Sequence, residues 1–221
     1  EPFEGLFTQG MVCHETYKDH MNNWISPDET IILNGERVLK ENNQIKLKIG
    51  PSESMSKSKR NTIDPAEIIH KFGADSVRLF ILSDSPPEKD VQWSDEGIEA
   101  SYKFILKLWS LHSKIVINLE KNYEDNQEGE LVKITNRFIK EITNNLNKFS
   151  YNIAVANIHE IYSALNKELN VKYSKKILLE NYRKILVCIM PLLPHFCSEA
   201  LENLNTNDTK IKWPSYNKKI L

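Results

Sequence analysis

The apolar residues between positions 98 and 119 repeat with the period of an α-helix, and this repeat constrains the fold more than any other feature of the sequence. The stripe steps alternately by four and three residues through Ile98, Tyr102, Ile105, Trp109, His112, Val116 and Leu119. This spacing places all of these side chains on one face of a helix, as a packed core requires. We therefore predict a long helix that buries this stripe, with His112 as a packed, hydrogen-bonded residue rather than a ligand.

Further amphipathic segments follow this helix, joined by short connections. Their apolar residues are Leu131, Ile134, Phe138, Ile142 and Leu146, then Ala154, Ile158, Ile161 and Leu165, then Ile177, Leu178, Tyr182, Ile185 and Ile189, and finally Phe196, Ala200 and Leu201. Helices that are apolar on one side and closely connected pack as a bundle. The predicted fold class is mainly α, with a helical bundle from about residue 94 to 206 preceded by a small α/β piece.

In the first part of the chain the apolar residues alternate as in strands, and turn-forming residues separate the runs. The run from Gly5 to Val12 predicts a buried strand, and residues 28–50 predict a small antiparallel sheet with a turn at Asn34-Gly35. Two helices are expected at about 65–72 and 74–83, because Asp64 and Pro65 favour a helix start and Pro86-Pro87 end the second helix.

Between the expected sheet and the first of these helices lies a short basic loop. It runs from Ser54 to Asn61 and carries the cations Lys57, Lys59 and Arg60 among small hydroxyl residues. Lysine charges, hydroxyl groups and backbone N–H groups on a flexible loop next to a helix suit the binding of phosphate oxygens. The alternative interpretation is an ordinary solvated loop before a helix.

The loop and the residues after it resemble a known family. Met55-Ser56-Lys57-Ser58 is similar to the KMSKS motif of class I aminoacyl-tRNA synthetases, with Ser54 in place of the first lysine. The residues that follow resemble the same family at Asn61, Asp64-Pro65, Phe72-Gly73-Ala74-Asp75 and Arg78. The resemblance implies that Lys57 is catalytic and that Ser54, Met55, Ser56, Lys57, Ser58 and Lys59 bind ATP, with Mg²⁺ carried by the nucleotide.

Within this family the chain is most similar to leucyl-tRNA synthetases of bacterial type. The residues that carry this resemblance are Phe7–Val12, the hairpin insertion before the loop, Ser83–Pro87, Val91–Gly97, Pro191 to His195, and Trp213-Pro214. It implies ATP-dependent activation of leucine and its transfer to tRNA(Leu). It also implies three parts: the end of a Rossmann catalytic domain at 1–64, linking helices at 65–93 and an anticodon-binding bundle at 94–221. Arg78, Lys103 and Lys107 are the candidate tRNA contacts.

The family has a second motif, His-x-Gly-His, and none of the six histidines of this sequence has that spacing. We therefore expect a fragment that is inactive alone and needs the N-terminal catalytic half, either in the same protein or as a separate chain. The alternatives are a non-catalytic tRNA-binding module or subunit, a plain structural helical domain, and a valyl, isoleucyl or methionyl relative.

Net charge, cysteine content and the length of apolar runs limit the partners and the cellular compartment that we expect. The net charge of -1 argues against a histone-like polyanion binder but not against a local phosphate site. Three cysteines, an odd number, favour reduced thiols in a cytoplasmic protein, and no apolar run is long enough to cross a membrane. Cys13, His14, Glu15 and His20 match no zinc spacing, so we expect no metal site.

Overall fold

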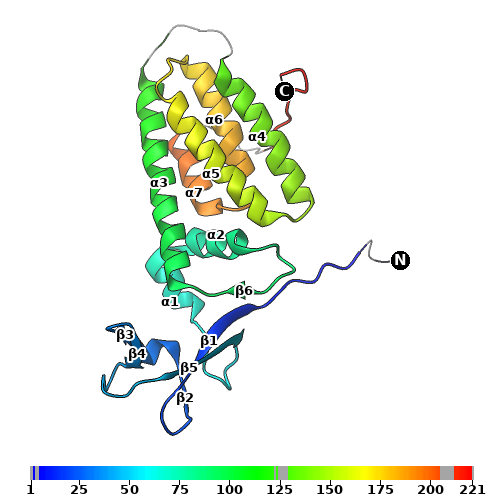
Figure 1. The fold of residues 1–221 in the computed structure, drawn as a ribbon. Helices are drawn as coiled ribbons and strands as arrows, with labels where there is room; N and C mark the ends of the chain where they lie inside the picture. Colours follow the sequence, from blue (N-terminus) through cyan, green and yellow to red (C-terminus); the bar gives the residue numbers. More distant parts are fainter. Residues whose placement is uncertain (1, 3–4, 122, 124–128, 205–211, 221) are drawn as a thin grey trace. The chain divides into compact units, whose positions relative to one another are not determined.

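The computed structural model describes all residues except 1, 3–4, 122, 124–128, 205–211 and 221 (Figure 1). The chain divides into two compact units. One comprises Glu1–Lys71 with Pro87–Gly97, and the other comprises Phe72–Pro86 with Ile98–Leu221. We call them the sheet unit and the bundle unit. The three functional parts expected from the sequence are not tested by this division and stay a prediction.

The sheet unit is built around strand β1 (Val12–Lys18), which pairs with three other strands. β5 (Lys48–Ser54) and β2 (Trp24–Ile25) run antiparallel to β1, and β6 (Val91–Gln92) runs parallel to it. The register between β1 and β5 is irregular between His14 and Thr16, where the ladder slips. Such a bulge leaves backbone groups that other partners must satisfy.

The strand predicted for Gly5–Val12 is wrong in its position. β1 begins only at Val12, and Leu6, Phe7 and Met11 are 90%, 44% and 54% exposed. Gly10 has a different reason to be small, because a Cβ at this position would lie 2.1 Å from the carbonyl oxygen of Lys89. The glycine allows the chain before β1 to run close to residues 87–90, where the Gly10 N–H donates to the Pro87 carbonyl at 2.8 Å.

The hairpin predicted within residues 28–50 is confirmed, and residues 45–47 also pair with it, but the strand that delivers the loop belongs to the sheet around β1. β3 (Thr30–Leu33) and β4 (Glu36–Leu39) pair antiparallel across Asn34-Gly35, where both residues have positive φ. A two-residue turn of this type needs both residues in the left-handed region, which asparagine and glycine adopt at low cost. A 3-10 turn, η1 (Pro27–Glu29), precedes the hairpin, and β5 leaves it to pair with β1.

The predicted helical bundle is confirmed. Its helices are α3 (Asp95–Glu120), α4 (Glu130–Asn147), α5 (Tyr151–Glu168), α6 (Lys175–Ile189) and α7 (Pro194–Asn203). The two helices expected before it are α1 (Pro65–Phe72) and α2 (Ala74–Asp84). α4 packs against α5 and α6, and α2 packs against α5 and α7. One apolar core runs through α2 to α7, with Ile142, Ile158 and Leu193 fully buried.

The buried face of α3 lies one residue away from the predicted stripe. Phe104, Leu108, Leu111 and Ile115 are buried, whereas Trp109 is 37% exposed. The two stripes share Ile98, His112 and Leu119, so the period was correct and the angular position of the face was not. His112 is packed and hydrogen-bonded as expected, with its Nδ1 3.0 Å from the hydroxyl of Tyr182.

Candidate functional site

The basic loop connects the end of β5 at Ser54 with the start of α1 at Pro65. Asp64 caps that helix, because its Oδ1 accepts the N–H of Ala66 at 2.8 Å. At the other end the Met55 N–H donates to the Val12 carbonyl of β1 at 3.2 Å. The backbone of β1 therefore holds one end of the loop, and the helix cap at Asp64 holds the other.

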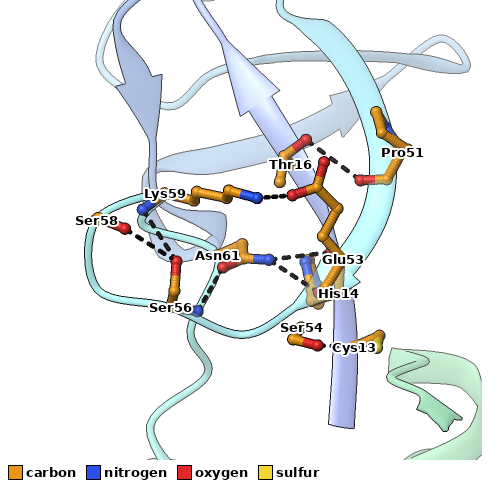
Figure 2. A network of polar contacts seen from close by, with 10 residues as sticks. All are labelled: Cys13, His14, Thr16, Pro51, Glu53, Ser54, Ser56, Ser58, Lys59 and Asn61. Carbon is orange, nitrogen blue, oxygen red and sulfur yellow. Dashed lines mark hydrogen bonds and ion pairs between the residues drawn. The ribbon is translucent and has the colours of Figure 1, made fainter. Parts of the chain in front are cut away.

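Between these ends the loop is folded into a compact turn with its own hydrogen bonds (Figure 2). The Ser56 hydroxyl accepts the N–H of Lys59 at 3.3 Å and lies 3.2 Å from the hydroxyl of Ser58. The Arg60 N–H donates to the Lys57 carbonyl at 3.3 Å, and Arg60 takes a positive φ of 53°. The hydroxyl residues thus shape the turn itself.

Asn61 ties this turn to two strands. Its Oδ1 accepts the N–H of Ser56 at 2.8 Å, and its Nδ2 donates to the carbonyls of His14 in β1 and Glu53 in β5 at 3.2 Å each (Figure 2). His14 and Glu53 are register partners at the edge of the irregular part of the β1–β5 ladder. Asn61 is only 1% exposed, so these bonds are shielded from water.

Two of the three cations of the loop are paired within the sheet unit. Lys59 forms an ion pair with Glu53, and Arg60 forms one with Glu29 at 2.8 Å. Both pairs are partly exposed, so each contributes at most about 1 kcal/mol to folding. Lys57 differs: it is exposed, and within the described part of the chain its side chain makes no hydrogen bond or ion pair. It is the loop's charge left available to an external anion.

The other residues predicted for the ATP site lie in this same turn. Ser54 is the last residue of β5, with its hydroxyl 4.0 Å from the Cys13 sulfur, and Met55 and Ser56 are half-buried. Sequence reasoning placed no role on Glu53 or Glu29. Asn61 enters the prediction only through the resemblance. The partners of these three residues are not adjacent in the sequence, so the local sequence pattern does not reveal them.

Arg78, predicted to contact tRNA, is engaged inside the bundle unit. Its Nε donates to the Leu192 carbonyl at 3.1 Å, and its Nη2 donates to the Pro191 carbonyl at 2.7 Å. One turn earlier on α2, the buried Asp75 carboxylate accepts the N–H groups of His195 and Phe196. The pair holds the α6–α7 turn and caps α7. These contacts give Arg78 a structural task, and its tRNA contact stays a prediction.

Lys103 and Lys107 lie on the exposed side of α3. Lys103 pairs with Glu99 at 3.6 Å in an exposed i,i+4 arrangement, and Lys107 stands close enough to His159 to help burial lower the pKa of that imidazole. Both ammonium groups therefore remain accessible on one helix.

The thiols and acidic groups of the described residues offer no alternative chemistry. Cys13, Cys188 and Cys197 are free and buried, and burial raises the pKa of Cys188 to about 12, which makes it a poor nucleophile. Within the described ranges no cluster of His, Cys, Asp and Glu could hold a metal ion. Nor does any described helix have the length and apolar character needed to span a membrane.

Family models match two segments of the chain. Residues 50–94 match the class I tRNA synthetases (I, L, M and V), and residues 128–221 match the anticodon-binding domain of tRNA ligase. The first segment contains the loop, α1 and α2, and the second contains α4 to α7. These matches place the chain among the class I tRNA synthetases.

Whole-chain comparisons narrow the relationship. The chain is 40% identical to the leucine–tRNA ligase of Rickettsia bellii over 92% of its own length and 24% of that protein. It is 37% identical to the leucine–tRNA ligase of Bartonella bacilliformis over 100% of its length and 27% of that protein. The chain thus spans about a quarter of the length of the curated relatives it matches.

A solved structure shows the same fold. It is the crystal structure of the ternary complex of Agrobacterium radiobacter K84 agnB2 LeuRS, tRNA and LeuAMS, which superposes with a TM-score of 0.65 at 24% identity. The match covers 76% of this chain and 23% of that one. This likeness concerns the fold. The sequence matches show that the chain belongs to the family of leucine–tRNA ligases, as a segment of that kind of protein.

Proposed function

We propose that this chain is the part of a leucine–tRNA ligase that supplies the lysine loop for ATP-dependent activation of leucine and the helical bundle that binds tRNA(Leu). The observation that carries the proposal is the position of Lys57. It is an exposed cation that makes no hydrogen bond or ion pair with the residues that the structure describes, and it lies in a turn whose other cations are paired. The choice of leucine as the amino-acid substrate is supported by the relatives named leucine–tRNA ligase.

The reaction explains why a free lysine is needed. A carboxylate oxygen of leucine attacks the α-phosphorus of ATP, the bond from that phosphorus to the bridging oxygen breaks, and pyrophosphate leaves with its Mg²⁺. Negative charge therefore grows on the bridging and leaving oxygens. A lysine aimed at that charge stabilises the transition state more than bound ATP, which is how it raises the rate.

The remaining loop residues have supporting tasks in this proposal. The hydroxyl groups of Ser56 and Ser58 lie together at the tip, where they can donate to phosphate oxygens in place of their mutual contact. Ser54 and Met55 hold the root of the loop at β5 and β1. Lys59 is paired with Glu53 and contributes less charge to the nucleotide than Lys57.

The second half of the proposal is tRNA binding by the bundle unit. Its support is the match of residues 128–221 to the anticodon-binding domain of tRNA ligase. Lys103 and Lys107 on α3 are the proposed phosphate contacts, because both are exposed and neither is buried in a network. Three buried free cysteines suit a reducing compartment, and we propose the cytoplasm as the site of action.

Leucine-dependent exchange of pyrophosphate into ATP tests the activation step. It is measured with this chain alone and with a leucine–tRNA ligase segment that carries a His-x-Gly-His motif. We expect exchange only in the mixture, and with leucine rather than valine, isoleucine or methionine. Exchange that depends on one of those other amino acids would contradict the leucine assignment. If the mixture shows no exchange but still binds tRNA, the alternative interpretation as a non-catalytic tRNA-binding module would be favoured.

Filter binding of tRNA(Leu) over a series of salt concentrations tests the bundle surface. Lys103→Glu with Lys107→Glu should weaken binding and reduce the salt slope by roughly 1 to 2 units, because two phosphate contacts are lost. The matched control is Lys133→Glu with Lys184→Glu, which reverses two exposed charges that pair with Glu130 and Glu180. Equal effects in both double variants would contradict a local contact on α3.

A further inference from the structure

We infer that Asn61 is a positioning residue of the activation reaction: it fixes the base of the lysine loop to strands β1 and β5 and thereby sets where Lys57 points. The inference rests on the proposed function, since it assigns a task within the same site. Among the described residues, the hydrogen bond of the Asn61 side chain to the loop is with the backbone N–H of Ser56, so its effect acts through the backbone (Figure 2).

The chemistry of the three contacts requires asparagine. One side-chain oxygen must accept the Ser56 N–H, and one nitrogen must donate to two carbonyls at the same time. Only a primary amide offers an acceptor and two donors on one group. Aspartate has the same shape but would place a carboxylate against the carbonyl oxygens of His14 and Glu53, and glutamine is longer by one methylene group.

The irregular β1–β5 ladder explains why these carbonyls need a side chain. The register slips immediately after the His14–Glu53 pair, so the strands do not continue the regular exchange of hydrogen bonds there. A buried backbone carbonyl without a partner costs free energy comparable to a lost hydrogen bond. The Asn61 amide supplies donors at this place and, with its oxygen, joins the start of the turn to its end.

Burial separates this anchor from the other contacts of the loop. Asn61 is 1% exposed, whereas the paired side chains of Lys59 and Arg60 are 40% and 48% exposed. Exposed ion pairs are screened and rearrange readily, while hydrogen bonds shielded from water hold their geometry. Asn61 is therefore the contact that determines the conformation of residues 56–61 when the ion pairs open.

The consequence for catalysis is a loss of rate with little loss of ATP affinity. Without the anchor, Lys57 keeps its charge and exposure but not its direction. Misplacement by about 1 Å can cost about 100-fold in rate. Ground-state attraction between a lysine and a triphosphate depends less on direction, so the KM for ATP should change by a few-fold only.

The test compares Asn61→Asp with Asn42→Asp in the assembled ligase. Asn42 is an exposed residue of the same unit whose Oδ1 accepts the Gln44 N–H at 3.1 Å, a bond that aspartate keeps. We expect Asn61→Asp to lower kcat for exchange about 100-fold and Asn42→Asp to leave it unchanged. In Asn61→Asp, trypsin should also cut after Lys57, Lys59 or Arg60 about tenfold faster, with no change at other sites.

Three results would contradict either the role of Asn61 or the proposed function on which it rests. Wild-type kcat in Asn61→Asp, with activity abolished in Lys57→Ala, would overturn the role of Asn61 and leave the proposed function standing. Full activity of Lys57→Ala would instead contradict the proposed function. If Asn61→Asp does not fold, amide exchange of the wild-type chain decides: protection of the Ser56 N–H relative to that of Ser58 supports the anchor, and equal exchange overturns it.

Discussion

The sheet unit and the bundle unit keep their shapes by different means. In the bundle unit one continuous apolar cluster runs through α2 to α7. In the sheet unit the buried apolar residues are few, namely Cys13, Tyr17, Val38, Leu47 and Val91, and polar residues of comparable number are buried beside them, namely His14, Thr16, Thr30 and Asn61. The bundle depends on area removed from water, whereas the loop region depends on single hydrogen bonds with defined partners.

The two units should therefore respond differently to the loss of a single contact. A core of many apolar contacts tolerates the loss of one of them at a graded cost in stability. A turn joined to its strands through one buried amide should lose its orientation when that amide is changed, even if the unit stays folded. Placing the proposed catalytic lysine on the second kind of support gives it a defined direction.

The largest change in stability should come from the bundle core. Ile158 on α5 is fully buried, so Ile158→Ala should lower the free energy of unfolding by about 2–5 kcal/mol through lost burial and the cavity left behind. Ile153 on the same helix is 49% exposed, and Ile153→Ala should change it by less than about 0.5 kcal/mol. Urea unfolding followed by circular dichroism measures both, and similar losses would contradict the assigned core.

A smaller loss should follow from removing a cap that acts across the fold. Asp75 accepts two N–H groups at the start of α7 and is buried, so Asp75→Ala should cost about 2 kcal/mol. Asp64 caps α1 locally and is exposed, so Asp64→Ala should cost about 0.5–1 kcal/mol. The comparison uses urea unfolding, with amide exchange at His195 and Phe196 as a local probe. A larger loss from Asp64→Ala would reverse this ranking.

The smallest effect should be a dependence of stability on pH. Burial lowers the pKa of His112 below its ordinary 6.5, so the folded chain keeps this imidazole neutral while the unfolded chain protonates it. The contribution is complete above pH 6.5 and is lost progressively as the pH falls below that value. Unfolding curves at pH 7.5 and 5.5 should therefore differ less in His112→Gln than in the wild type. An unchanged difference would show that other groups cause the dependence.

The difference between the units also explains what sequence could predict. The periods of α3 to α7 reveal the bundle, because core packing repeats every few residues. The error on α3 was small, since Trp109 and Phe104 are both aromatic and either could face the core. What decides between them is the position of the neighbouring helices, which no local pattern contains.

The sheet unit was less predictable for the same reason. Residues 45–49 alternate as a strand should, but nothing nearby shows that residues 45–47 pair with the hairpin while β5, which begins at Lys48, pairs with β1. The loop's residues were identified by resemblance, yet its compact turn was not. Its shape depends on Asn61 meeting His14, a contact between residues 47 positions apart.

Leucine-dependent pyrophosphate exchange by the assembled ligase carrying Lys57→Ala tests the central claim most directly. The control is Lys46→Ala, which removes an exposed lysine of the same unit that pairs with Glu36. We expect Lys57→Ala to lower kcat by about 100-fold or more while the fold is retained, because transition-state charge loses its stabilising cation. Lys46→Ala should stay within about twofold of the wild type, since exposed pairs contribute little. Equal activity of both variants would contradict the assignment of Lys57 as the catalytic residue.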